Sequence, residues 1–308
     1  MSIEEKHLVN VLKRCICCNQ ENISDFFCRG IYNVQKCDDC GAQFVNPRFF
    51  EDSINSVYPD DYWSNESSNI AKAAITNELG MSQRAQGDIA LLSKYFSKKI
   101  SYLDVGFGTA HALEAARKLG WDVCGIDPSI EAVEFAKKKG IENVILGCFE
   151  ENLISDQKFD LITAFDCFEH IVDPNKFLID CKNVLNDNGL IAIAVPNVAS
   201  VSARINQKRW SQYIFPDHLN FYSSSTLKII ANRNNLTVED EFSFPSISLG
   251  VRELLKKLQS NYNIKILSYL INFITSFKKY IFYPPANYLC KKFNIESNLL
   301  FVILKKEK

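Results

Sequence analysis

The chain lacks long apolar runs and any excess of charge of one sign. No stretch reaches the roughly 18 uninterrupted apolar residues of a membrane-spanning helix, and residues 1–14 are charged, without the apolar core of a secretory signal. The formal net charge is −1 over 308 residues, whereas a general nucleic-acid-binding protein normally carries a basic surface. We therefore expect a cytoplasmic globular protein that binds no nucleic acid, and the 47% apolar and 23% charged composition is ordinary for one.

The near-neutral total hides an uneven distribution. Residues 251–308 hold eleven Lys and Arg against three Glu, a net of +8, which leaves −9 for the first 250 residues because the whole chain carries −1. Residues 251–297 combine these lysines with Leu, Ile, Phe and Tyr, a composition that predicts a helical insertion. We favour a packing or dimer layer for it, with weak contact to an anionic membrane surface as the alternative. The sequence leaves the oligomeric state open.

The cysteines are concentrated near the N-terminus. Six of the 11 lie between residues 15 and 40, and the other five stand singly in apolar contexts, as expected of reduced core residues. Two C-x-x-C pairs, Cys15 with Cys18 and Cys37 with Cys40, are separated by 18 residues, a spacing typical of zinc ribbons. Four thiolates close a tetrahedral shell around Zn²⁺, so the predicted zinc is structural. Cys17 could replace Cys15 as a ligand, but it stands too close to Cys18.

Two other uses of these cysteines are less favoured. Disulfides need an oxidising compartment, and the chain shows no secretory route. A redox C-x-x-C is disfavoured because the motif is duplicated. A ribbon of about 30 residues cannot bury enough surface to fold alone, so a bound metal would supply its folding free energy.

A glycine turn occupies residues 102–110. An apolar strand delivers Asp104, and Gly106 and Gly108 then allow a sharp turn close to a ligand before a helix begins. The carboxylate of Asp104 would repel the pyrophosphate of a dinucleotide and attract a cationic amino group. His111 stands where a dinucleotide fingerprint would have its third glycine. The turn therefore favours S-adenosylmethionine, which carries an amino group and an adenosine.

A second acid follows the turn. Residues 120–127 predict a short strand that ends at Asp127, 19 residues after Gly108. In the doubly wound fold, an acid at the end of the second strand binds ribose hydroxyls. Pro128 then opens a helix, since Pro suits the first helical turn. The alternative is that Asp127 only caps this helix; its distance from the glycine turn favours ribose binding.

Strands and helices go on alternating along the chain. Helical periodicity spans residues 69–96, broken near Gly80 and Gly87, and Asn188-Gly189 predicts a turn before a strand. This alternation predicts an α/β fold with a doubly wound, mostly parallel, seven-stranded Rossmann-like sheet. We divide the chain into a zinc ribbon (1–48), a helical cap or linker (49–98) and a cofactor-binding domain (99–308) with a helical insertion at about 251–297. Predicted strands lie at 143–147, 159–165, 190–195, 236–244 and 298–304, and predicted helices at 110–119, 129–139, 174–185 and 224–232.

These motifs resemble those of class I S-adenosylmethionine-dependent methyltransferases. The resemblance covers about residues 100–245 and the last strand, and includes Leu103-Asp-Val-Gly-Phe-Gly108, Gly125-Ile-Asp-Pro128 and Phe159-Asp-Leu-Ile162. Glu169-His170-Ile171 and Val195-Pro-Asn197 are similar to the ubiquinone-biosynthesis-like branch. A zinc ribbon ahead of such a domain resembles the sugar methyltransferases of surface-polysaccharide and deoxysugar pathways.

The resemblance also implies roles for single residues. In the sugar enzymes a Glu-His pair stands in the loop after the fifth strand, and Asp217-His218 takes that place here. We expect His218 to be the base or orienting group with Asp217 as its partner, and His170 is the rival. Asp166 and Glu169 could line the pocket or hold a divalent ion, although the ubiquinone-like pattern has Glu at position 166. The expected contacts of the cofactor's adenine are Phe149 and Glu150.

The expected function is methyl transfer from S-adenosylmethionine to a sugar, nucleotide- or lipid-linked, or to a related small metabolite of surface-polysaccharide biosynthesis. A hydroxyl or carbon acid must lose a proton during transfer, so a base is required. One alternative is methylation of RNA or protein through the ribbon, and another is a non-catalytic cofactor-binding protein. A dinucleotide oxidoreductase is opposed by Asp104 and His111.

Overall fold

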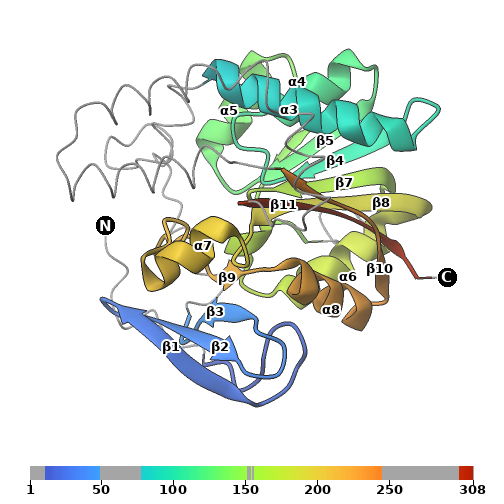
Figure 1. Ribbon diagram of the computed structural model, residues 1–308. Helices are drawn as coiled ribbons and strands as arrows, with labels where there is room; N and C mark the ends of the chain where they lie inside the picture. Colours follow the sequence, from blue (N-terminus) through green and yellow to red (C-terminus); the bar gives the residue numbers. More distant parts are fainter. Residues whose placement is uncertain (1–10, 49–77, 151–153, 155, 245–297, 308) are drawn as a thin grey trace.

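Two β-sheets organise the molecule in the computed structural model (Figure 1). The structure describes residues 11–48, 78–150, 154, 156–244 and 298–307. A seven-stranded sheet forms the centre, and a four-stranded sheet, built mostly from N-terminal residues, lies beside it. None of the helices in these ranges is both long and apolar enough to cross a membrane.

The large sheet has the strand order β10-β11-β8-β7-β4-β5-β6. Neighbouring strands from β6 to β8 pair in parallel, whereas β11 pairs antiparallel with β8 and β10. The prediction of a mostly parallel seven-stranded sheet is confirmed. From β4 the chain adds β5 and β6 on one side, and it then adds β7 and β8 on the other side of β4. Ligands of doubly wound folds bind at the switch point between two such strands, here β4 and β7. The strands are β4 (Ser101–Val105), β5 (Asp122–Asp127), β6 (Val144–Leu146), β7 (Phe159–Phe165), β8 (Leu185–Pro196), β10 (Leu236–Phe244) and β11 (Leu299–Lys306).

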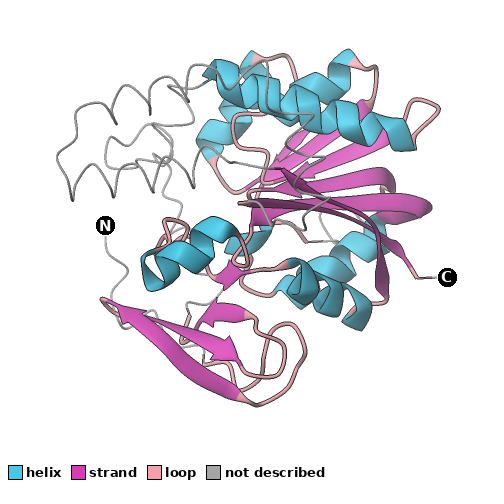
Figure 2. Ribbon diagram, in the orientation of Figure 1, coloured by secondary structure: helices cyan, strands magenta, loops and turns pink. Residues whose placement is uncertain are grey.

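Helices cover both faces of the large sheet (Figure 2). Successive strand residues point to opposite faces, so Leu103 and Ile162 join one apolar cluster and Tyr102 and Leu161 join the other. Two buried layers of helix against sheet result, as the doubly wound prediction requires. The helices α3 (Glu78–Leu92), α4 (His111–Lys118) and α5 (Ile130–Lys138) lie over one face, and α6 (Pro174–Val184) and α8 (Ser224–Arg233) over the other.

The predicted break in the helix before the glycine turn is wrong. α3 runs through Gly80 and Gly87 without interruption. Its residues Ile89 and Leu92 are buried in the same apolar cluster as α4. Burial of this face outweighs the roughly 1 kcal/mol by which each glycine disfavours a helix. The rest of the predicted cap, residues 49–77, lies outside the described residues, as does the predicted insertion at 251–297.

The predicted turn at Asn188-Gly189 falls inside β8, which begins five residues earlier than predicted, at an irregularity of its ladder with β7. Both residues belong to β8, which begins directly after α6. Leu185 pairs with Phe159, but the next pair of the ladder is Leu190 with Leu161, so the residues between form a bulge. A turn dipeptide in sequence therefore serves as an irregularity inside a strand.

The small sheet joins the N-terminal ribbon to a distant loop. Its strands are β1 (Ile23–Arg29), β2 (Tyr32–Cys37), β3 (Gln43–Val45) and β9 (Asn220–Phe221), in that order and all antiparallel. β9 ends the loop that leaves β8, which also contains α7 (Val201–Asn206) and η6 (Gln207–Arg209). The ribbon is therefore packed against the loop that was expected to carry the acceptor residues.

Candidate functional site

The glycine turn begins where β4 ends, at the switch point of the large sheet. Gly106 and Gly108 have φ angles of +70° and +51°, in the left-handed region that favours glycine. The N–H of Gly106 donates to the carbonyl of Ile126 at 2.8 Å, which ties the turn to β5. A Cβ atom on Gly106 would lie 2.7 Å from Sγ of Cys167. The turn is thus held close to the residues that follow β7.

Asp104 is a buried carboxylate beside this turn. Its side chain is 3% exposed, and Oδ1 accepts a hydrogen bond of 2.6 Å from the hydroxyl of Thr163. The pKa of Asp104 is raised to about 7, chiefly by burial and also by the charge of Asp127, although the hydrogen bonds from Thr163 and Tyr102 lower it. In the absence of a ligand, burial disfavours the ionised form of this acid. A cationic ligand would favour the carboxylate, so the site suits such a ligand.

Asp127 ends β5 and faces the same turn. Its Oδ2 accepts from the N–H of Gly108 at 2.9 Å and its Oδ1 from the N–H of Ser129 at 2.9 Å. Burial raises the pKa of Asp127 to about 6. Ser129 is the N-cap of α5, and Pro128 stands between the two residues. The alternative that Asp127 itself caps this helix is therefore wrong.

A pocket opens between α3, the glycine turn and the end of β7. Its lining includes Arg84, Asp88, Asp104, Gly106 and Asp166. Nη1 of Arg84 lies 2.7 Å from Oδ2 of Asp166, and Nε lies 3.6 Å from a carboxylate oxygen of Asp88. The predicted pocket residue Asp166 is therefore present, held at a φ of +48°. Sequence reasoning missed Arg84, because no motif marks an arginine in the helix that precedes the turn.

Phe149 and Glu150 follow β6, where adenine contacts were expected. The ring of Phe149 is 8% exposed and packs edge-on against Phe177, with centroids 5.4 Å apart. Glu150 is exposed. The pocket as described has neither residue in its lining, so the structure places Phe149 in the apolar core beside the site.

Two histidines lie in contact beyond the end of β7. His170 belongs to η5 (Phe168–His170), after β7, and His218 precedes β9. Their rings lie edge to face with centroids 4.8 Å apart. Burial lowers the pKa of His170 to about 4 and that of His218 to about 3, so both imidazoles are neutral at physiological pH.

Main-chain carbonyl groups orient both rings. Nδ1 of His218 lies 2.8 Å from the carbonyl oxygen of Gln212, and Nδ1 of His170 lies 2.9 Å from that of Asp217. A neutral imidazole that donates from Nδ1 keeps a lone pair on Nε2. With Nδ1 of His218 donating to the carbonyl of Gln212, the lone pair of this ring lies on Nε2. Asp217 contacts His170 through its main-chain carbonyl group. The expected pairing of Asp217 with His218 is therefore replaced, in this contact, by a pairing with His170.

Glu169 adds a buried carboxyl group to this pair of histidines. It is 2% exposed, and its Oε2 has no hydrogen-bond partner among the described residues. Burial raises the pKa of Glu169 well above its usual value, and the charge of Asp166 acts in the same direction. Burial therefore favours the protonated form of Glu169, which can donate a hydrogen bond.

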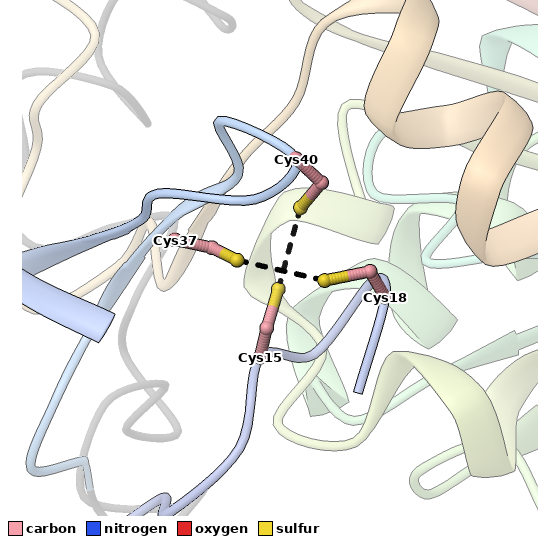
Figure 3. A group of neighbouring side chains, drawn as sticks. All are labelled: Cys15, Cys18, Cys37 and Cys40. Carbon is pink, nitrogen blue, oxygen red and sulfur yellow. Dashed lines mark hydrogen bonds between the residues drawn. The ribbon is translucent and has the colours of Figure 1, made fainter. Parts of the chain in front are cut away.

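The four predicted metal ligands point toward one centre (Figure 3). Sγ of Cys15 lies 3.5 Å from that of Cys40, and Sγ of Cys18 lies 3.5 Å from that of Cys37. All four sulfur atoms lie within 4.8 Å of one another. Zn–S bonds of about 2.3 Å in a tetrahedron require sulfur separations of about 3.8 Å, so the four thiols fit such an ion. Cys17 stays outside the group and donates its main-chain N–H to Sγ of Cys15 at 3.4 Å.

Comparisons with known proteins agree with this geometry. Among curated proteins, the ubiquinone biosynthesis O-methyltransferase of Glaesserella parasuis serovar 5 (strain SH0165) is 31% identical over 112 residues, which are 33% of this chain and 47% of that protein. The protein of the same name from Bradyrhizobium sp. (strain ORS 278) is 28% identical over 152 residues, 44% of this chain and 60% of that protein. The chain therefore spans about half the length of the curated relatives it matches.

A solved structure supports the fold. The plantazolicin methyltransferase BamL, crystallised with a triazolic desmethylPZN analog and SAH, superposes with a TM-score of 0.52 at 18% identity, over 84% of this chain and 97% of that one. A family model described as "Methyltransferase domain" matches residues 79–241, more than half of the 308 residues. With the glycine turn and the two acids inside the matched range, the chain belongs to this family of methyltransferase domains.

Proposed function

We propose that the protein is an S-adenosylmethionine-dependent methyltransferase whose acceptor is a sugar or a related small metabolite. The observation that carries the cofactor assignment is the pair of buried acids, Asp104 and Asp127, on either side of a glycine turn. When bound, S-adenosylmethionine supplies a methyl group already activated by its sulfonium, so the protein mainly has to position and desolvate the acceptor.

The donors of the pocket, together with Asp127 at the adjoining end of β5, fit each part of this cofactor. Asp104 offers a carboxylate for the amino group, and Asp127 keeps free lone pairs for ribose hydroxyls, since each carboxylate oxygen accepts more than one hydrogen bond. Arg84 offers a guanidinium for the methionine carboxylate, with Asp166 and Asp88 holding it in the pocket wall. A pyrophosphate would meet two carboxylates in the same place, which opposes a dinucleotide.

We assign the base to His218, with His170 packed against it. His218 is neutral, and its Nδ1–H is held by the carbonyl of Gln212, so Nε2 is the atom that would take a proton from an acceptor hydroxyl or carbon acid. Burial favours the protonated form of Glu169, and in that form it would donate a hydrogen bond to an acceptor hydroxyl. The sugar assignment rests on the likeness of the ribbon and of the Asp217-His218 loop to the sugar methyltransferases.

The four-cysteine group is proposed as a structural Zn²⁺ site. Four thiolates would fill a tetrahedral shell and leave no open position for a substrate. The ribbon is small, and the metal would stabilise it by linking the loop before β1 to the loop after β2.

A second acceptor class is an aromatic hydroxyl group of a quinone precursor, because the curated relatives are named ubiquinone biosynthesis O-methyltransferases. The test uses S-adenosylmethionine labelled in its methyl group, with a panel of nucleotide sugars and a catechol offered separately. Transfer to a nucleotide sugar supports the proposal, and transfer to the catechol alone replaces it with the second class. His218→Ala should keep cofactor affinity and lose most turnover. A protein that binds S-adenosylhomocysteine but transfers to nothing in the panel is the non-catalytic alternative.

A further inference from the structure

The loop that carries His218 is fastened to the ribbon on both sides of this residue. On the C-terminal side, the N–H of Val45 in β3 donates to the carbonyl of Leu219 at 2.8 Å, and the β3–β9 ladder follows directly. On the N-terminal side, the hydroxyl of Tyr213 donates to Oε1 of Gln43, also in β3, at 2.5 Å. His218 therefore lies between two points that β3 holds in place.

Arg29 adds a third attachment from the end of β1. Its Nη1 donates to the carbonyl of Tyr213 and its Nη2 to the carbonyl of Lys208, each at 2.8 Å. The guanidinium carbon lies 5.8 Å from the ring of Phe27 and 5.7 Å from that of Phe215. One planar cation thus joins two carbonyl groups of the loop to the ribbon, a geometry that the single ammonium of a lysine does not reproduce.

These attachments bear on the orientation of His218 through Gln212. The carbonyl of Gln212 meets Nδ1 of His218, and Gln212 immediately precedes Tyr213, the residue that both Arg29 and Gln43 hold. Tyr213 is itself buried, with its ring 4.7 Å from that of Phe221 in β9. A shift of Tyr213 would move the carbonyl that fixes the tautomer of His218.

We propose that Arg29 and Gln43 are positioning residues of the ribbon, which hold the main chain of residues 208–213 so that His218 presents Nε2 to the acceptor. The assignment of His218 as base rests on the proposed function. The positioning concerns the tautomer of His218 and the order of the main chain at residues 208–213. Both can be measured without turnover. The ribbon then contributes to acceptor chemistry and leaves the cofactor pocket untouched.

The test compares the double variant Arg29→Ala/Gln43→Ala with Arg29→Lys and with a control, Arg14→Ala. Arg14 is an arginine of the same ribbon, and its side chain forms an exposed ion pair of 2.6 Å with Glu21. In the wild type and the control, ¹⁵N NMR should show His218 protonated on Nδ1. The double variant should show a mixture of tautomers and faster exchange of the main-chain amides of Tyr213 and His218.

Turnover provides the second readout. Misplacement of a reacting group by about 1 Å costs on the order of 100-fold, so we expect kcat of the double variant to fall 10- to 100-fold, with Arg29→Lys between it and the wild type. Affinity for S-adenosylhomocysteine should stay unchanged in all variants. An Nδ1 tautomer and amide protection retained in the double variant would overturn the proposal. If the wild type transfers no methyl group, the proposed function fails, and the NMR comparison still decides the positioning.

Discussion

Cofactor binding should be coupled to the loss of a proton from Asp104. In the free protein, burial raises the pKa of Asp104 to about 7, from an ordinary value of 3.8. A bound cationic amino group favours the carboxylate and lowers its pKa, so binding releases a proton wherever the free acid was still protonated. Affinity should rise with pH through about 7 and level off above it.

The size of the effect follows from the same pKa. At pH 6 about nine-tenths of the free protein carries protonated Asp104, so affinity should be about tenfold weaker than at pH 8, a free-energy difference of about 1.4 kcal/mol. Asp127, with a pKa of about 6, is about half protonated at pH 6, which adds at most about twofold to the loss there if ribose binding requires its carboxylate. The pKa of about 7 for Asp104 in the free protein already includes the charge of Asp127 and the hydrogen bonds from Thr163 and Tyr102.

Isothermal titration calorimetry with S-adenosylhomocysteine at pH 6, 7 and 8 measures this coupling. Two buffers with different ionisation enthalpies give the number of protons released, which should approach one at pH 6. The matched variant Asp104→Asn cannot ionise, so it should bind more weakly and lose the pH dependence between 6 and 8. A wild-type affinity that is flat over this range, with no proton release, would refute the reasoning.

Three further perturbations test separate parts of the site. Gly106→Ala combines a φ of +70° with a Cβ only 2.7 Å from Sγ of Cys167, so we expect about 1–3 kcal/mol of destabilisation, read from thermal unfolding; an unchanged Tm would contradict the packing. Cys37→Ser should lose bound zinc by elemental analysis, yet keep S-adenosylhomocysteine affinity within about twofold, corresponding to less than about 0.5 kcal/mol; full metal content would exclude Cys37 as a ligand. Arg84→Gln should weaken the same affinity by about tenfold or more, since a hydrogen-bonded ion pair is worth about 1.5–3 kcal/mol; equal affinity would remove Arg84 from the cofactor site.

The sequence predicted the large sheet well because local signals and tertiary structure agree there. Apolar strands end in Asp104 and Asp127, and α6 begins at Pro174, where the helix over 174–185 was predicted. The errors fell where long-range packing outweighs a local signal. Gly80 and Gly87 stay helical because their helix buries Ile89 and Leu92 in one apolar cluster with α4. Gly189 lies in β8 where its ladder with β7 is irregular.

Half of the candidate site depended on contacts that no local pattern encodes. Arg84 meets Asp166 across 82 residues of sequence, and Arg29 meets Tyr213 across 184. Neither arginine carries a motif, and their roles appear only when the chain is folded. Sequence could name His218 and His170 as rivals, but not that the two rings touch.

The central claim is that Asp104 and Asp127 hold S-adenosylmethionine and exclude dinucleotides. Calorimetric titration of the wild-type protein with S-adenosylhomocysteine and, separately, with NAD⁺ tests it most directly. The account predicts binding of S-adenosylhomocysteine in the micromolar range, about −8 kcal/mol, that Asp127→Ala abolishes, and no detectable binding of NAD⁺. Binding of NAD⁺ with none of S-adenosylhomocysteine would contradict it.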